Sequence, residues 1–253
     1  NGGYIVSSRN EITGRGRSMR HYKRPLTICR ANLDYRLDNH HSLNLNYLLS
    51  RIGNDRYDEA DTDFEASNDF LAIHVTGFSY IHSLLEEKMS NTFFVKNYIN
   101  HLNIRQTDLS SITGSKDVKG TITKKYWGYG IGSRYTAIEP LSIKISYEHS
   151  VRLPLARELL GNGTTIYANV ALKPESSDNV NLGIFGTWHP APGHTLYYEA
   201  NGFLRYVDDY IQATVETKEG MMQYENVPAV HFKGIEGEVR YDWQSKLQIG
   251  RAH

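Results

Sequence analysis

Hydrophobic and polar residues alternate one by one along much of the chain. The clearest stretch is 141–150, in which leucine, isoleucine and tyrosine alternate with serine, lysine and glutamate. Alternation with a period of two is typical of a β-strand whose two faces meet different surroundings. This pattern predicts an all-β chain of nine strands, at 25–37, 42–50, 69–81, 88–105, 125–137, 141–150, 179–188, 195–206 and 235–243.

The connections between these strands alternate in length. Short turns rich in Gly, Pro, Asn and Asp are predicted at 38–41, 82–87, 138–140 and 190–193, and long loops at 53–68, 106–124, 153–178 and 208–228. Strict alternation gathers all the long loops at one end of the sheet. Transmembrane barrels have this arrangement, whereas soluble sandwiches have Greek-key crossings and less regular lengths. The sequence therefore predicts a transmembrane antiparallel meander.

Charged residues occupy the middle of the predicted strands on the polar face only. They are Lys144, Glu148, Glu199, Arg205, Glu236, Glu238 and Arg240. An unpaired charge in a dry core costs several kcal/mol, so this face must meet water. The opposite face is apolar and needs a second sheet or lipid to cover it. The mean hydropathy of −0.51 and the lack of any run of about 20 apolar residues exclude a helical membrane protein but not a barrel.

Aromatic residues fall at two levels of the predicted strands. Trp188, Tyr198, Tyr241 and Trp243 lie near the short-turn end, and Trp127 and Tyr206 near the other end. Rings with polar tips collect at membrane interfaces, and barrels in the outer membrane have two such girdles. The alternative is that aromatic residues are simply favoured in strands. The two levels favour membrane-interface girdles.

Both ends of the sequence suggest a piece of a longer protein. It begins at Asn1 with no Met and no signal peptide, and residues 248–253 are what a common sequencing-adapter DNA encodes in one frame. We therefore expect a partial barrel domain at 1–247 and a non-native tail at 248–253. The single cysteine, Cys29, can form no internal disulfide.

A series of motifs occupies the second half of the chain, at 147–154, 158–163, 169–183, 224–227 and 233–238. The residues that define these motifs are Leu172, Lys173, Pro174, Glu175, Asn179, Glu225, Asn226, Gly234 and Glu236. In this order and spacing, the motifs resemble the late barrel of TonB-dependent outer-membrane receptors, especially those of Bacteroidetes. The specific resemblance covers about two fifths of the chain, and the earlier part matches in strand rhythm alone.

This resemblance implies a barrel of about 22 strands, closed by an N-terminal plug that this sequence does not contain. It implies a receptor in the bacterial outer membrane that binds a scarce nutrient, such as a siderophore, a vitamin or a glycan. The receptor would import the nutrient with energy from the TonB complex. Outer-membrane lipid, the TonB complex and a small nutrient ligand are the implied partners, with no nucleic acid, cofactor or enzymatic activity. The fragment itself should form a curved open sheet with two unpaired edges.

Two other functions remain open at this point. One is a different outer-membrane barrel, either a passive porin or a barrel enzyme, which a complete gene without a plug would favour. The other is a soluble all-β binding module, which solubility without detergent would favour.

Four further features have weaker chemical interpretations. The acidic loop 53–68 could hold Ca²⁺, although its spacing is not that of an EF-hand and a solvated loop is favoured. His40 and His41 are adjacent, so they point in opposite directions and do not share a metal. The segment 9–24 carries six positive charges and one negative, which favours a basic loop over an anion-binding surface. Gly128, Gly130 and Gly132 lack a following helix, so we expect strand glycines rather than a nucleotide site.

Overall fold

The computed structural model is one antiparallel sheet with a single short helix among the described residues. It describes residues 2–13, 16–58, 67–108, 116–161, 166–216, 221–243 and 247–251, with side chains for 23–55, 69–104, 120–161, 166–215 and 222–243. The elements are β1 (Gly2–Thr13), β2 (Gly16–Arg36), β3 (His41–Asp58), β4 (Ser67–Leu84), β5 (Met89–Asp108), β6 (Lys116–Ile138), β7 (Leu141–Arg152), α1 (Ala156–Leu160), β8 (Glu175–Trp188), β9 (His194–Glu216), β10 (Met221–Trp243) and β11 (Leu247–Arg251).

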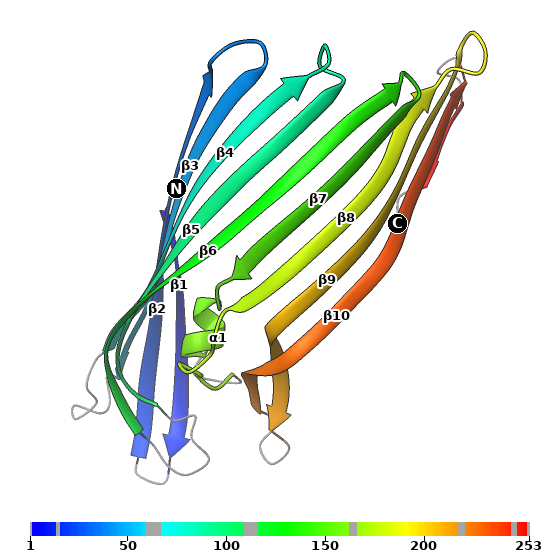
Figure 1. Cartoon of the computed structure of the whole chain (residues 1–253). Coiled ribbons are helices and arrows are strands. Elements are labelled where there is room, and N and C mark those ends of the chain that lie inside the picture. Colours follow the sequence, from blue (N-terminus) through cyan, green and yellow to red (C-terminus); the bar gives the residue numbers. More distant parts are fainter. Residues whose placement is uncertain are drawn as a thin grey trace.

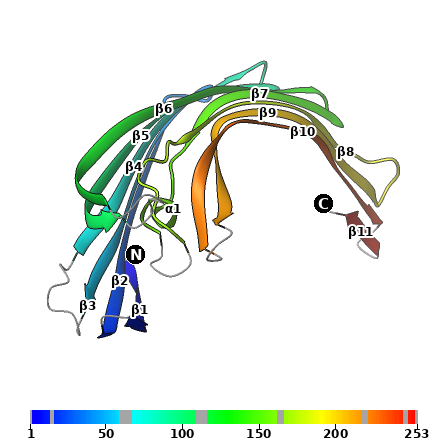
Figure 2. The same cartoon turned by 90° about the horizontal axis from the view of Figure 1, so that it is seen from below.

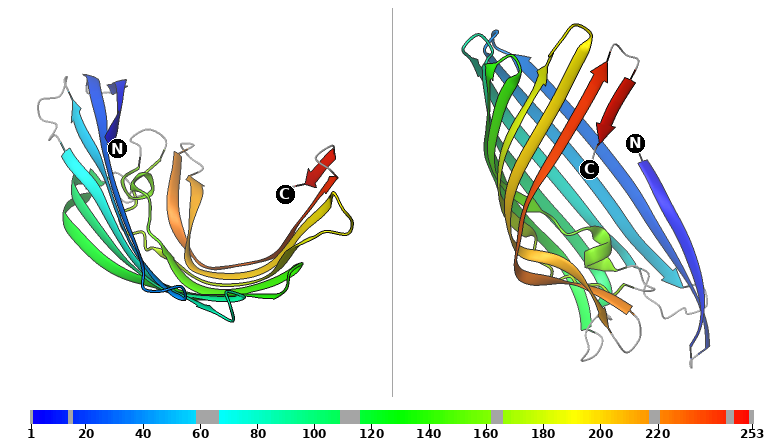
Figure 3. Two further views of the ribbon diagram at one scale, coloured as in Figure 1. Left: turned by 90° about the horizontal axis from the view of Figure 1, so that it is seen from above. Right: turned by 90° about the vertical axis from the view of Figure 1, so that its right-hand side faces the viewer.

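The eleven strands follow one another in chain order, each paired with its neighbours along the sequence. The sheet is tilted and strongly curved, so that it forms an open trough with α1 on its concave side (Figures 1, 2 and 3). The nine predicted strands correspond to β2–β10, which confirms the predicted meander. The outermost strands, β1 and β11, were not among them.

The register separates an apolar face from a polar face. Ile143, Ile184 and Ala200 lie side by side on the convex face, and the next residues, Lys144, Gly183 and Asn201, share the concave face. Large apolar side chains on the convex face are exposed: Leu182 is 56% exposed and Ile235 is 87% exposed. Among the described residues no second layer covers this face, so the apolar side of the sheet is its outer surface.

The concave face is polar in the half that lies toward the short turns. Asn44 Nδ2 donates to Asn32 Oδ1 at 2.9 Å, and Asn46 Nδ2 donates to Asn44 Oδ1 at 2.8 Å. Lys144 Nζ lies 2.7 Å from Glu199 Oε1 on the same face. These contacts fit the prediction that the charged face meets water.

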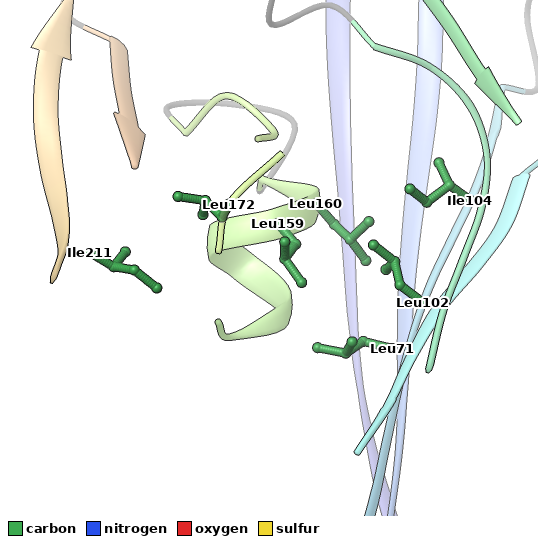
Figure 4. Close-up of a cluster of buried hydrophobic side chains, with 7 residues drawn as sticks. All are labelled: Leu71, Leu102, Ile104, Leu159, Leu160, Leu172 and Ile211. Atoms are coloured by element: carbon green, nitrogen blue, oxygen red, sulfur yellow. The ribbon is translucent and has the colours of Figure 1, made fainter. Parts of the chain in front are cut away.

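The pattern reverses in the other half of the concave face, toward the opposite rim. There the inward-pointing side chains are apolar and buried, and they surround α1. The cluster consists of Leu71, Leu102, Ile104, Leu159, Leu160, Leu172 and Ile211 (Figure 4). The buried core of the described chain therefore lies inside the trough, at one end of it.

Three predicted long loops contain long strand extensions, so their predicted bounds were wrong. The segments 106–124 and 208–228 are mostly taken up by extensions of β5, β6, β9 and β10, and the described residues of 53–68, at 53–58 and 67–68, belong to β3 and β4. Beyond the apolar band the alternation weakens, but backbone pairing continues and needs no side-chain pattern. The segment 153–178 is the predicted long loop that does leave the sheet over most of its length.

The basic segment 9–24 is also not a loop. Residues 2–13 and 16–36 form a β-hairpin in which Arg9 pairs with Arg20. Backbone hydrogen bonds between strands do not depend on the charge of the residues they join, so a run of basic residues does not by itself predict a loop.

Candidate functional site on the concave face

The candidate site is built around residues 153–161 and 166–174, here called the inward segment. It begins where β7 ends at Arg152, directly before Leu153 and Pro154, both of which are buried. Proline lacks an N–H and cannot continue a ladder, so the chain leaves the sheet at this point. It then turns into the trough, forms α1 and rejoins the sheet as β8 (Figure 1).

Arg152 ties the two ends of this segment together. One of its terminal nitrogens lies 2.7 Å from Glu158 Oε1, and the other lies 3.3 Å from Glu175 Oε1. Glu158 is 1% exposed, and its Oε2 also accepts from the backbone N–H of Leu155 at 2.8 Å. Because a buried carboxylate is costly unless it is paired, the position of α1 depends on Arg152.

Asn226 of β10 holds the end of the inward segment through its side-chain amide. Its Oδ1 accepts from the Lys173 N–H at 2.9 Å, and its Nδ2 donates to the Lys173 carbonyl at 3.0 Å. The same Nδ2 donates to the Asp209 carbonyl at 2.7 Å. The amide thus imitates a strand neighbour for Lys173 while it fixes a bend in β9.

That bend lies opposite Pro228. Pairing between β9 and β10 is interrupted at Asp209 and Pro228, and Asp209 has a φ of 52°, in the left-handed region. Proline cannot donate to the ladder, so the interruption follows from its sequence position. Beyond it the paired ends of β9 and β10 turn toward the concave side (Figure 2).

Further hydrogen bonds join the inward segment to β10. Tyr167 N–H donates to the Met222 carbonyl at 2.8 Å, and Asn169 Nδ2 donates to the Tyr224 carbonyl at 2.8 Å. On the other side of the trough, Arg24 Nη2 of β2 donates to the Gly161 carbonyl at 3.0 Å. The segment is therefore held from strands at both sides of the sheet.

Hydrophobic packing makes the same connection. Leu159 and Leu160 of α1 cluster with Leu102 and Ile104 of β5, while Leu172 and Ile211 belong to the same cluster from the other side (Figure 4). Burying such a side chain stabilises the fold by about 1.5–3 kcal/mol. The inward segment thus bridges β4 and β5 to β9 and β10 across the concave face.

Polar groups continue along the concave wall from this bridge toward the short turns. Asn179 accepts from Arg205 Nε at 2.8 Å, and its Nδ2 donates to Ser150 Oγ at 3.1 Å. Lys96 Nζ lies 3.0 Å from Glu148 Oε1. Such a wall can hydrate a passage or hold a polar partner by hydrogen bonds and ion pairs.

The structure brings most of the motif residues together and leaves others apart. Leu172, Lys173, Glu175 and Asn226 meet at the inward segment through the contacts above, and Pro174 borders a small cavity beside β5 and β6. Glu225 is exposed, and Gly234 and Glu236 lie further along β10 on the concave face. Most of the motif residues therefore connect the inward segment to the sheet, and the others follow β10 away from that connection.

The six aromatic residues proposed as girdles lie on the convex face. Trp127, Trp188, Tyr206 and Trp243 are 59%, 53%, 50% and 44% exposed. Tyr198 donates to the Pro140 carbonyl at 2.5 Å, and Tyr241 OH lies 2.5 Å from His194 Nδ1 at the short-turn rim. A position at a membrane interface stays a prediction.

The structure describes the weaker candidates only in part. Asp55 and Asp58 fall in β3, while Glu59, Asp61, Asp63 and Glu65 lie outside the described residues. Within the described ranges no group of three His, Cys, Asp or Glu could hold a metal ion. His41 stacks on His82 with ring centroids 4.6 Å apart. Gly128, Gly130 and Gly132 lie in β6, as predicted. In the same ranges no helix is long and apolar enough to span a membrane.

Sequence reasoning missed the course of the inward segment and the roles of Arg152 and Glu158. The available signal was Glu158 followed by two leucines. A carboxylate at the third position of a helix can cap its start, and the leucines then need a covering surface. That surface, the reversed alternation of β4 and β5, was also present in the sequence.

Comparison with known proteins adds a family. A family model described as "TonB dependent receptor-like, beta-barrel" matches residues 101–252, more than half of the chain. A search of curated proteins found no match to the chain.

Solved structures share its fold at low identity. The hemophore receptor HasR of Serratia marcescens has a TM-score of 0.62 and 17% identity over 94% of this chain and 42% of that one. The copper transporter OprC has a TM-score of 0.71 and 14% identity over 96% and 40%. The FrpB iron transporter of Neisseria meningitidis (F5-1 variant) has a TM-score of 0.64 and 14% identity over 95% and 38%. The chain spans about two fifths of the length of these structures.

Proposed function

Because the chain belongs to the TonB-dependent receptor β-barrel family, we propose that it forms part of an outer-membrane receptor that binds a scarce nutrient and imports it. Import would use energy delivered by the TonB complex. The family and its structural relatives are transport receptors rather than enzymes.

The observation that carries the proposal is the opposite character of the two faces of one curved sheet. The convex face is bare and apolar, and the concave face carries ion pairs such as Lys144–Glu199. A sheet of this kind is stable where lipid covers the outside and water fills the inside. The bacterial outer membrane, with the convex face in lipid, is therefore the proposed location.

The complete receptor in this proposal has about 22 strands. This chain supplies ten of them, β1–β10, because β11 falls almost wholly in the proposed non-native tail. A plug domain would fill the trough and carry the segment that engages TonB. We place the short turns in the periplasm and the inward segment at the cell surface. The six aromatic residues then form the two interface girdles, and 248–253 are a non-native tail.

The cargo is proposed as a class. Relatives of the same fold are named for heme, copper and iron. Their low identity supports the fold alone, so a siderophore, a vitamin and a glycan all stay within the proposal. A membership of the Bacteroidetes branch is likewise a proposal, which rests on the motif residues around Lys173 and Asn226.

Uptake in living cells tests this function. The complete gene that encodes these strands is expressed in a Gram-negative host that lacks its own receptors, and accumulation of radiolabelled ferrichrome, cobalamin and maltodextrin is measured. We expect at least one probe to accumulate, and we expect accumulation to fall to the empty-vector level when tonB is deleted. Accumulation that is equal with and without tonB would instead identify a passive pore.

A further inference from the structure

The convex face contains a groove over β8, β9 and β10. Its volume is about 890 Å³. Leu182 and Ile184 border it on β8, and Ile235 borders it on β10. Its floor is formed by small residues of the middle strand, Ala200 and Gly202.

The groove floor is open toward the outside. A Cβ added to Gly202 would meet nothing nearer than the Leu182 carbonyl oxygen, at 3.9 Å. On the concave side, by contrast, a Cβ added to Gly183 would come within 2.2 Å of Asn201 Oδ1. The missing side chain at Gly202 therefore leaves open space on the convex face, between the branched side chains of β8 and β10 that line the groove.

A single cation stands at one end of the described groove. Lys233 lines it, and its cross-strand neighbours on the convex face are Leu204 and, beyond that, Val180. The side chain is exposed, and within the described part of the chain it takes part in no ion pair. An ammonium group next to an apolar groove, with no ion-pair partner in the described ranges, is complementary to an anionic head on an apolar tail.

The position of Lys233 along the strand fits a membrane interface. Lys233 precedes Trp243, at the short-turn rim, by ten residues of β10. This corresponds to about 33 Å along the strand and about 25 Å along the axis of a barrel tilted by about 40°. The apolar band of an outer-membrane barrel is about 25 Å tall. Lys233 therefore stands at the far edge of the band, next to the rim that carries the inward segment.

We propose that this groove binds one molecule of lipid A, the membrane anchor of lipopolysaccharide. One acyl chain would lie over Ala200 and Gly202, and a lipid A phosphate would pair with Lys233. The inference rests on the proposed function, because it needs the inward-segment rim to face the cell surface. Lipopolysaccharide occupies that leaflet, so we choose lipid A over a phospholipid.

Native mass spectrometry of the purified complete receptor tests the site. The detergent-solubilised protein is titrated with lipid A, with dephosphorylated lipid A and with phosphatidylglycerol. We expect a one-to-one adduct with lipid A that dephosphorylation weakens. Lys233→Gln should weaken lipid A binding by about five-fold, the effect of one lysine near a charged lipid surface. Gly202→Leu, which fills the groove, should weaken all three lipids.

Two variants serve as controls. Lys88→Gln removes a lysine from a short turn, and Ala31→Leu enlarges an exposed residue on the convex face of β2, away from the groove. Both should bind lipid A as the unmodified receptor does. Folding of each variant is checked by its heat-modifiable migration, and if Gly202→Leu does not fold, Lys233→Gln still decides.

Three outcomes would overturn the inference. They are equal lipid A affinity of Lys233→Gln and the unmodified receptor, equal loss in the two control variants, and equal or tighter binding of phosphatidylglycerol. The titration needs neither nutrient nor TonB, so it can fail while nutrient uptake succeeds. Conversely, nutrient uptake can fail while the titration still shows lipid A binding, so the two proposals are tested separately.

Discussion

At the scale of single residues, the concave face is packed so closely at some positions that one added methyl group would clash with a neighbouring atom. Gly130 of β6 lies beneath Phe94, and a Cβ at this position would come within 2.4 Å of the ring and 2.7 Å of the Tyr147 carbonyl oxygen. Gly132, two residues along on the same face, has its nearest neighbour, Ser146 Cβ, at 3.8 Å. Close packing therefore requires a glycine at position 130 but not at position 132.

Substituting these glycines with alanine should separate the two cases. Gly130→Ala should lower the free energy of unfolding by about 1–3 kcal/mol, because the backbone oxygen of Tyr147 cannot move aside easily. Gly132→Ala should change it by less than about 0.5 kcal/mol. Urea unfolding of the refolded receptor in lipid vesicles, followed by tryptophan fluorescence, measures both. Equal effects of the two substitutions would contradict the packing described for Phe94.

Asn226 offers a second residue-level prediction, because its amide both accepts and donates. Asn226→Asp keeps the acceptor for the Lys173 N–H but replaces a donor by a carboxylate that faces the carbonyls of Lys173 and Asp209. We expect a loss of about 1–3 kcal/mol in the free energy of unfolding, the cost of leaving such groups unsatisfied. The neighbouring Glu225→Gln, at an exposed position, is the matched control and should be neutral. A neutral Asn226→Asp would show that the connection of the inward segment to the sheet does not depend on this side chain.

At the scale of elements, the strands were predictable where one face is apolar and exposed and the other face is polar. Alternation identified β2–β10 because this contrast persists through the apolar band. It failed at the strand ends: Val207 and Ile211 of β9 are buried on the concave face, where Asn201 and Arg205 earlier in the same strand are polar. At these strand ends the concave face is the apolar one, because the inward segment covers it. The sequence of a strand does not show that a distant segment of the chain will cover it.

The inward segment should therefore loosen as a unit when its packing is removed. Leu159 is 2% exposed, and Leu159→Ala should lower the local stability of the segment by about 2–4 kcal/mol. Leu155→Ala, at a side chain that is 43% exposed, is the control. Hydrogen exchange of the Tyr167 and Asn169 amides, which donate to Met222 and Leu159, reports the change. Faster exchange in β8 to the same extent would contradict a separately anchored segment.

The short turn 37–40 gives a prediction about pH. Asp38 Oδ1 accepts from the N–H groups of His40 and His41 at 2.7 and 2.8 Å, and the first of these bonds in particular lowers the pKa of the carboxyl from its usual 3.8. The turn is then stabilised above the ordinary pKa and loses this support as the pH falls through the lowered one. A ¹³C titration of the Asp38 carboxyl should have its midpoint below 3.8. A midpoint at or above that value would mean that the carboxylate does not hold the turn.

At the scale of the whole molecule, eleven strands form an open trough whose concave side is crossed by one segment (Figure 3). A lone sheet with a bare apolar face and unpaired edge strands is unfavourable in water. Lipid outside and further strands at the edges resolve both problems, which is why the fold and the proposed membrane receptor support each other. The nutrient could not be predicted from the sequence. Strand periodicity shows which face a side chain lies on, but it does not show which side chains would bind a ligand.

The most direct test of the two-faced sheet compares adjacent residues of β8. In a Cys29→Ala background, Leu182→Cys and Asn181→Cys are each labelled with bimane, and the receptor is refolded in vesicles that contain lipids with a doxyl quencher on the acyl chain. Leu182 lies on the convex face, and the Asn181 side chain donates to Ser146 on the concave face. The label at 182 should be strongly quenched and the label at 181 should not. Equal quenching at the two positions, or stronger quenching at 181, would contradict the account.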